Sequence, residues 1–218
     1  MDSAEFTFAH RFVPGSDPSA PTLLLLHGTG GDESELLPVG RQLWPGAALL
    51  SPRGPVNENG MARFFRRHAP GLFDLDDLHQ RSHDLANFVS AAVSHYDLDS
   101  SRVVWVGYSN GANIAASTLL LRPQAVRAAV LWHAQIPFRP EQPPNLATHE
   151  VLMTAGREDP IVPPTETEKL AELLTACGAA VQTAWFPAGH ALSPDDIGAA
   201  KRWLRCVIGG GDGPASVD

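Results

Sequence analysis

The chain has 218 residues, of which 44% are hydrophobic and 18% charged, a composition that predicts one well-packed globular domain and excludes a mostly disordered chain. Sixteen basic residues against 24 acidic ones leave a formal net charge of -8. No run of Lys and Arg is long enough to follow a phosphate backbone or an anionic membrane surface, so we expect no nucleic-acid partner.

Targeting and cross-linking signals are also missing from the sequence. The N-terminus has no basic region followed by an apolar one, and no segment approaches the roughly 18 apolar residues of a membrane span. Cys177 and Cys206 lie in helical-looking segments without a second Cys or a His at metal-ligand spacing. We therefore expect a cytoplasmic protein with no membrane span, no metal and two reduced cysteines.

Short apolar runs alternate with amphipathic stretches from residue 22 onward, a pattern typical of β–α units. It predicts an α/β fold, a mainly parallel doubly wound sheet with helices on both faces, in a single domain over residues 1–208. The predicted strands are residues 5–13, 22–26, 47–50, 102–106, 126–132, 151–155 and 180–186. The predicted helices are residues 33–43, 79–96, 110–121, 163–177 and 194–207.

Two segments show no sustained period. Residues 51–78 contain several prolines and glycines. Loops of this length are usually functional, so we predict an irregular excursion that serves as a lid or as a wall of the substrate pocket. Residues 209–218 are Gly-rich and polar, which predicts a flexible C-terminal tail.

The pentapeptide Gly107-Tyr108-Ser109-Asn110-Gly111 stands between a predicted strand and a predicted helix. This order exposes a hydrolase nucleophile at the carboxyl edge of a sheet, and the two glycines keep side chains away from neighbouring backbone. Because the motif is short and arises by chance, its placement carries the argument. We predict Ser109 as the nucleophile and the amide of Asn110, at the helix start, as a donor to a developing oxyanion.

A serine nucleophile needs an acid and a base, and in this fold both follow it, in that order, after later strands. Asp159 follows the predicted strand at 151–155 and is the predicted acid, with Glu158 as the alternative. His190 follows the last predicted strand and is the predicted base. Most other histidines lie on predicted helices or strands or in the excursion, where a lone histidine is usually a packing or surface residue.

The loop His27-Gly28-Thr29-Gly30-Gly31-Asp32-Glu33 follows a buried strand, and its glycines let amides approach a ligand closely. A nucleotide site is an alternative. However, the loop lacks the third glycine of a dinucleotide-binding fingerprint and the lysine of a P-loop. We predict the amide of Thr29 as the second oxyanion donor, with His27 and Asp32 bracing the loop.

Four further residues are candidates for contact with the substrate. Phe64 and Phe65 lie in the long excursion, His133 follows a predicted strand that ends at the same sheet edge, and Ile161 follows the predicted acid. Apolar side chains there suit an apolar acyl group, and core packing is the alternative for each. The sequence leaves the oligomeric state open, with a homodimer as one option.

In chain order, these motifs resemble the phospholipase/carboxylesterase family of small α/β-hydrolases, which includes acyl-protein thioesterases and bacterial carboxylesterases. The resemblance covers nearly the whole chain, from about Phe6 to Val207. It rests on the following segments: His27-Gly28-Thr29-Gly30-Gly31-Asp32-Glu33, Arg63-Phe64-Phe65, Gly107-Tyr108-Ser109-Asn110-Gly111-Ala112, Gly156-x-x-Asp159-Pro160-Ile161-Val162-Pro163 and Gly189-His190.

The resemblance implies a cofactor-free serine carboxylesterase acting on a small-molecule ester. It implies a triad of Ser109, Asp159 and His190, and an oxyanion hole of the Thr29 and Asn110 amides. The Thr-Gly-Gly-Asp-Glu loop and Arg-Phe-Phe look closer to a bacterial subgroup linked with hydroquinone or aromatic-compound detoxification than to the thioesterases.

Acyl-protein thioesterases tend to have Gln after the nucleophile, where this chain has Asn110, which argues against protein deacylation. An acyl-thioesterase or lysophospholipase of the same family stays open as an alternative. A non-catalytic binding domain on the same fold is the alternative of another class, and loss of a triad residue would be its expected sign.

Overall fold

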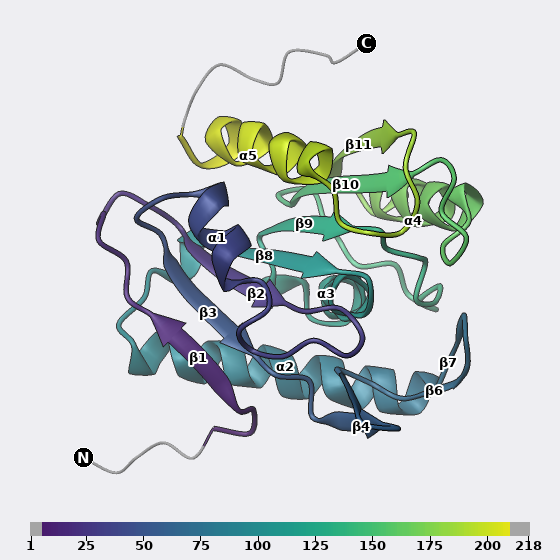
Figure 1. The fold of residues 1–218 in the computed structure, drawn as a ribbon, viewed down its shortest axis with the longest axis horizontal. Helices are drawn as coiled ribbons and strands as arrows, with labels where there is room; N and C mark the ends of the chain where they lie inside the picture. The colour runs from purple at the N-terminus through teal and green to yellow at the C-terminus, as the bar shows by residue number, and fades with distance from the viewer. Residues whose placement is uncertain (1–5, 210–218) are drawn as a thin grey trace.

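A mainly parallel β-sheet lies at the centre of the protein (Figure 1). The computed structural model describes residues 6–209. In that part of the chain, seven strands pair in the order β1-β3-β2-β8-β9-β10-β11, and only β1 runs antiparallel to its neighbour. The strands are β1 His10–Val13, β2 Thr22–Leu26, β3 Ala48–Pro52, β8 Val103–Tyr108, β9 Ala128–Trp132, β10 Glu150–Gly156 and β11 Ala180–Phe186.

Helices cover both faces of this sheet (Figure 1). On β2, Leu23 and Leu25 pack with α1 and α5, whereas Leu24 and Leu26 pack with α2, α3 and α4. This alternation follows from the two-residue period of a strand, and it explains why β2 is apolar along its whole length. The helices are α1 Leu37–Leu43, α2 Leu75–His95, α3 Asn110–Leu121, α4 Pro164–Ala176 and α5 Pro194–Gly209.

The excursion over residues 51–78 contains regular structure, so the prediction of an irregular loop was wrong. It forms two hairpins, β4 with β5 and β6 with β7. Asn59 and Gly60 both have positive φ, at 54° and 85°, and an Asn-Gly pair of this kind is a strong sequence signal for a two-residue hairpin turn. The hairpin strands are β4 Val56–Glu58, β5 Met61–Arg63, β6 Arg67–Ala69 and β7 Leu72–Phe73.

Helix α2 begins earlier than predicted, at Leu75. The reason is Asp74, whose side chain accepts a hydrogen bond from the amide of Asp77 and so caps the helix. Helix α1 begins later than predicted, at Leu37, after a series of turns. By contrast, α3 and β11 have their predicted bounds.

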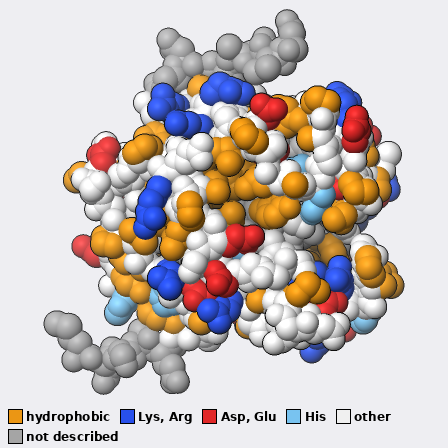
Figure 2. Space-filling model, in the orientation of Figure 1, with side chains coloured by type: hydrophobic (Ala, Val, Ile, Leu, Met, Phe, Trp, Pro, Cys, Tyr) orange, Lys and Arg blue, Asp and Glu red, His pale blue; other side chains and the backbone are white. Residues whose placement is uncertain are grey.

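Figure 2 shows hydrophobic side chains gathered in the middle of the face that carries α1 and α5, with Lys and Arg in small groups among acidic residues. Within residues 6–209, no helix is long and apolar enough to cross a membrane. Glu5, the first residue of the first predicted strand, and residues 210–218 of the predicted tail lie outside the described residues.

Candidate active site

Ser109 lies at a strained turn between β8 and α3. Its backbone has φ 51° and ψ -111°, a conformation that is costly for any residue with a side chain. A Cβ at Gly111 would lie 2.1 Å from the carbonyl oxygen of Leu26, and one at Gly107 would lie 2.5 Å from that of Gly111. The predicted reason for both glycines is thereby confirmed.

A hydrogen-bonded chain of three side chains runs from this turn. Nε2 of His190 lies 2.9 Å from Oγ of Ser109, and Nδ1 of His190 lies 2.7 Å from Oδ2 of Asp159. The three residues come from the ends of different strands: β8, β10 and β11. The structure therefore brings together the residues that the sequence predicted as nucleophile, acid and base.

The loops after β10 and β11 are held side by side by backbone contacts. The amide of Glu158 donates to the carbonyl of Ala188, at 3.1 Å. A Cβ at Gly156 would lie 2.1 Å from that same carbonyl oxygen, so only glycine allows the approach. The Glu158 side chain is exposed, whereas Asp159 is buried, and Asp159 is thus the carboxylate that reaches His190.

All the strong acceptor positions of Asp159 are occupied. Its Oδ1 accepts from the amides of Ile161 and Val162, at 2.8 and 2.9 Å, and its Oδ2 faces both His190 and His133. Burial by itself raises the pKa of Asp159, but the hydrogen bonds from Val162, His190 and Ile161 outweigh it and hold that pKa below its usual value. Asp159 is therefore ionised at neutral pH.

His133 is buried behind this chain, with 1% of its surface exposed. Its Nδ1 lies 3.2 Å from Oδ2 of Asp159, and its Nε2 lies 3.4 Å from Oδ2 of Asp196. Asp196, in the first turn of α5, also accepts from Thr154 and Ser193. The sequence analysis missed Asp196, although Ser193 and Asp196 have the spacing of a helix capping box.

The glycine-rich loop after β2 carries the first of the two predicted oxyanion donors. Within residues 6–209, neither the amide of Thr29 nor that of Asn110 donates to a protein acceptor. The loop is fixed to β5 by two contacts: the Gly30 amide donates to the carbonyl of Ala62 at 2.9 Å, and Nη1 of Arg63 donates to Oγ1 of Thr29 at 2.7 Å. Both amides are thus free to bind a ligand oxygen.

Arg63 is a further residue whose role the sequence analysis missed. Its side chain is buried, and it also donates to the carbonyl of Phe65 and pairs with Glu58. Burial lowers the pKa of Arg63 from its usual value, but a guanidinium stays charged at neutral pH. This positive charge lies directly behind the Thr29 hydroxyl.

His27 braces the same loop, as predicted. Its Nδ1 donates to the carbonyl of Gly28 at 2.6 Å, and its Nε2 accepts from the amide of Gly54 at 2.9 Å. Burial lowers the pKa of His27 and favours the neutral ring that this donor and acceptor pattern needs. Asp32 acts locally, accepting from the amide of Ser34.

The four predicted substrate contacts lie in different surroundings. Phe64 and Phe65 are fully buried and His133 is nearly so, and burial favours core packing for all three. Ile161 is 62% exposed, so its side chain is accessible from solvent next to the loop that carries Asp159.

His133, Asp159 and His190 are also close enough to hold a metal ion, because their ligand atoms lie within 4.8 Å of one another. However, Nδ1 of both histidines already faces the same carboxylate oxygen, Oδ2 of Asp159. A metal would have to replace both of these hydrogen bonds. The cluster is better explained as a hydrogen-bonded network of two histidines and a carboxylate than as a metal-coordination site.

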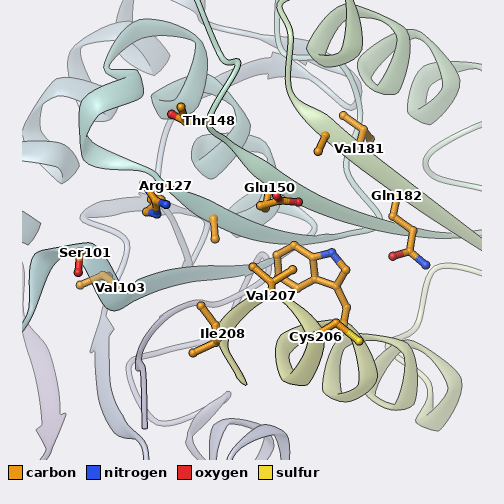
Figure 3. A pocket seen from close by; sticks show the side chains of 13 residues that line it. Ser101, Val103, Arg127, Thr148, Glu150, Val181, Gln182, Cys206, Val207 and Ile208 are labelled. Atoms are coloured by element: carbon orange, nitrogen blue, oxygen red, sulfur yellow. The ribbon is translucent and has the colours of Figure 1, made fainter. Parts of the chain in front are cut away.

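A cleft of about 430 Å³ lies elsewhere, at the amino ends of the strands (Figure 3). Its lining includes Ser101, two residues before β8, Glu150, the first residue of β10, and Cys206 on α5. Ser109 lies beyond the opposite, carboxyl end of β8. In open parallel sheets ligands bind at the carboxyl ends of the strands, so this cleft is not the site described above.

The fold and the site define a serine ester hydrolase of the α/β-hydrolase fold. The model of the phospholipase/carboxylesterase family matches residues 9–208, and the chain belongs to this family. It is 42% identical over 199 residues to the putative hydrolase MhqD of Bacillus subtilis. The matched residues cover 91% of this chain and 98% of that protein.

Solved structures agree with this membership. The Bacillus cereus carboxylesterase is 44% identical, with a TM-score of 0.90 over 93% of this chain and 95% of that one. A carboxylesterase from Mesorhizobium loti is 30% identical, with a TM-score of 0.87 over 93% and 96% of the two chains. Both similarities span nearly the whole of each protein.

Proposed function

We propose that the protein is a carboxylesterase that cleaves small-molecule carboxylic esters through Ser109, His190 and Asp159. The observation that carries this proposal is the continuous chain of hydrogen bonds from Oγ of Ser109 through His190 to Asp159. A serine hydroxyl is a weak nucleophile by itself, and a hydrogen-bonded imidazole oriented by a carboxylate activates it.

In the proposed reaction, Nε2 of His190 takes the proton of Ser109 while Oγ attacks the carbonyl carbon of the ester. The amides of Thr29 and Asn110 donate to the resulting oxyanion. His190 then gives its proton to the departing alcohol, which leaves an acyl-enzyme. Water, deprotonated by His190, attacks the acyl-enzyme and releases the acid and the free serine.

The low pKa of Asp159 suits its part in this sequence. A carboxylate that already accepts from Ile161 and Val162 has little tendency to take the proton itself. It instead holds His190 with Nδ1 protonated and stabilises the imidazolium as it forms. The proton therefore passes between Ser109, His190 and the substrate.

Two observations favour a small ester as the substrate. Two solved relatives, from Bacillus cereus and Mesorhizobium loti, are carboxylesterases by name. In addition, the side chain of Asn110 is engaged inside the protein, because its Oδ1 accepts from the amide of Phe64 at 2.7 Å. The residue after the nucleophile thus contributes to the shape of the site and is distinct from the glutamine typical of thioesterases.

Hydrolysis of p-nitrophenyl acetate by Ser109→Ala tests the proposal. We expect the variant to lose turnover and labelling by a fluorophosphonate probe, while the exposed helix variant Ser90→Ala keeps both. Normal turnover by Ser109→Ala would refute the assignment. A series of acyl esters and thioesters of increasing chain length then separates a short-chain esterase from a thioesterase or lysophospholipase.

A further inference from the structure

His133 joins two buried carboxylates that belong to different parts of the fold. Asp159 lies in the loop after β10, and Asp196 lies in the first turn of α5. His133 directly follows β9, and its amide donates to the carbonyl of Thr154 on β10, at 2.9 Å. The hydrogen-bonded chain at Ser109 therefore continues through His133 to the start of a helix.

The backbone at His133 has an unusual conformation. Its φ is 54°, and among residues 6–209 only Asn59, Asp97 and Ser109 share a positive φ without being glycine. A positive φ is uncommon for any residue other than glycine, including Asn, Asp and His, which tolerate it best. Strain of this kind persists where the surroundings hold a side chain in a required place. For His133, that place is between Asp159 and Asp196.

The two contacts require a charged ring. A neutral imidazole has one N–H and so could donate to one carboxylate only, whereas an imidazolium donates to both. Burial lowers the pKa of His133, but the two carboxylates outweigh burial and hold that pKa above its usual value. His133 is thus a buried cation flanked by two anions.

We propose that His133 is a positioning residue whose positive charge fixes Asp159 and limits the negative potential that Asp159 and Asp196 together exert on His190. This inference rests on the proposed function of Ser109 and His190. Without the charge on His133, two neighbouring carboxylates would favour the protonated form of His190, which cannot act as the base. His133 thereby extends activity to lower pH.

The titratable groups beside the ring of His133 are two carboxylates, a histidine and a tyrosine. Asp159 and Asp196 contact its ring nitrogens. The rings of His190 and Tyr108 lie 5.4 and 6.1 Å away from its centroid, both in edge-on geometry. Burial raises the pKa of Tyr108 further above neutrality. Tyr108 therefore stays uncharged and adds no charge to the group formed by His133 and its two carboxylates.

His133→Asn is the sharpest test, because Asn tolerates positive φ and keeps a hydrogen-bond-donating NH₂ group but carries no charge. We expect the acidic limb of kcat/KM against pH, for p-nitrophenyl acetate, to move about one pH unit upward. His68→Asn, at an exposed histidine, should leave the limb in place. If the acidic limb of kcat/KM stays at the same pH in His133→Asn, with or without a uniform loss of rate, then His133 contributes only packing.

A second measurement needs neither a folded variant nor activity. In the unmodified protein, the ¹⁵N shifts of the assigned His133 ring should show both nitrogens protonated at about pH 7.5, above the usual histidine pKa; a neutral ring would overturn the inference. Loss of function in Ser109→Ala is measured separately. If that loss occurs while His133 is neutral, the inference fails and the proposed function stands; if Ser109→Ala stays active, the proposed function fails.

Discussion

The amide of Phe64 donates a 2.7 Å hydrogen bond to Oδ1 of Asn110, and this bond joins the 51–78 excursion to the turn at Ser109. Both residues are buried. Since Asn110 also supplies a proposed oxyanion amide, the same residue fixes the neighbouring segment with its side chain and faces the substrate with its backbone. The excursion and the turn are therefore expected to move as one unit.

Removal of this bond should impair both stability and catalysis. Asn110→Ala leaves the buried Phe64 amide without an acceptor, which costs roughly 1–3 kcal/mol of unfolding free energy. It also loosens the backbone amide of residue 110, a proposed oxyanion donor, so kcat/KM should fall. Asn113→Ala is the matched control, because Asn113 lies on the same helix as Asn110 and its side chain accepts from the backbone amide of Gln135 at 3.0 Å. This variant should lose stability, measured by urea unfolding, and keep its rate of ester hydrolysis. Equal losses of activity in the two variants would contradict the argument.

The strain at Ser109 predicts a difference in stability between two variants at this position. With φ at 51°, Ser109→Gly relieves strain that Ser109→Ala retains, so the glycine variant should be about 1 kcal/mol more stable. At Ser90, exposed on α2, the order should reverse, since glycine is unfavourable in a helix by about 1 kcal/mol. Thermal unfolding of the four variants measures both differences. If Ser109→Ala is more stable than Ser109→Gly, the backbone at this turn is not strained.

Much of the fold could be predicted because the spacing of hydrophobic residues and the positions of turn-forming Gly and Pro residues indicate the same helices and strands. The buried strand Thr22–Leu26 and the helix at Asn110–Leu121 are such cases. The hairpins at residues 56–73 were missed because their strands are short and only partly buried, which leaves little hydrophobic period. The sequence does contain a turn signal, Asn59-Gly60, but the strands on either side of it are too short to show an alternating hydrophobic pattern.

The sequence placed Ser109, Asp159 and His190 correctly at one sheet edge, because parallel strands bring their carboxyl ends together. It could not place Arg63 or Asp196. Each contacts the site from a segment whose approach depends on tertiary packing, namely the β4–β5 hairpin and the start of α5. His133 could be placed at the edge, but its burial depends on tertiary contacts, among them the one with Asp196 at the start of α5.

The contact between Arg63 and Thr29 predicts coupled losses. Thr29→Val removes the hydroxyl that accepts from Arg63, so the Thr29 amide, a proposed oxyanion donor, loses an anchor. We expect kcat to fall about tenfold, equivalent to about 1.4 kcal/mol. Arg63→Met should act through the same anchor. The double variant should therefore be little worse than Arg63→Met alone. Losses of kcat that simply multiply in the double variant would show that the two residues act independently.

The stability of the protein should depend on pH through Asp196, whose pKa is lowered to about 2. Burial raises this pKa, but the hydrogen bonds from His133, Ser193 and Thr154 outweigh it. A carboxyl group with a lowered pKa stabilises the fold above its ordinary pKa, 3.8, and this contribution, roughly 2 kcal/mol, is lost as the pH falls toward the folded value.

Asp196→Asn should consequently be less stable than the unmodified protein at about pH 6, and the gap should narrow by roughly 1 kcal/mol at about pH 3. The upper pH is chosen because the raised pKa of His133 contributes stability that is present below about 6.5 and is lost as the pH rises through its folded value. Asp195→Asn, at the exposed neighbouring residue, is the control and should show no such change in urea unfolding. A gap for Asp196→Asn that stays constant between the two pH values would mean that Asp196 is not held ionised by its neighbours.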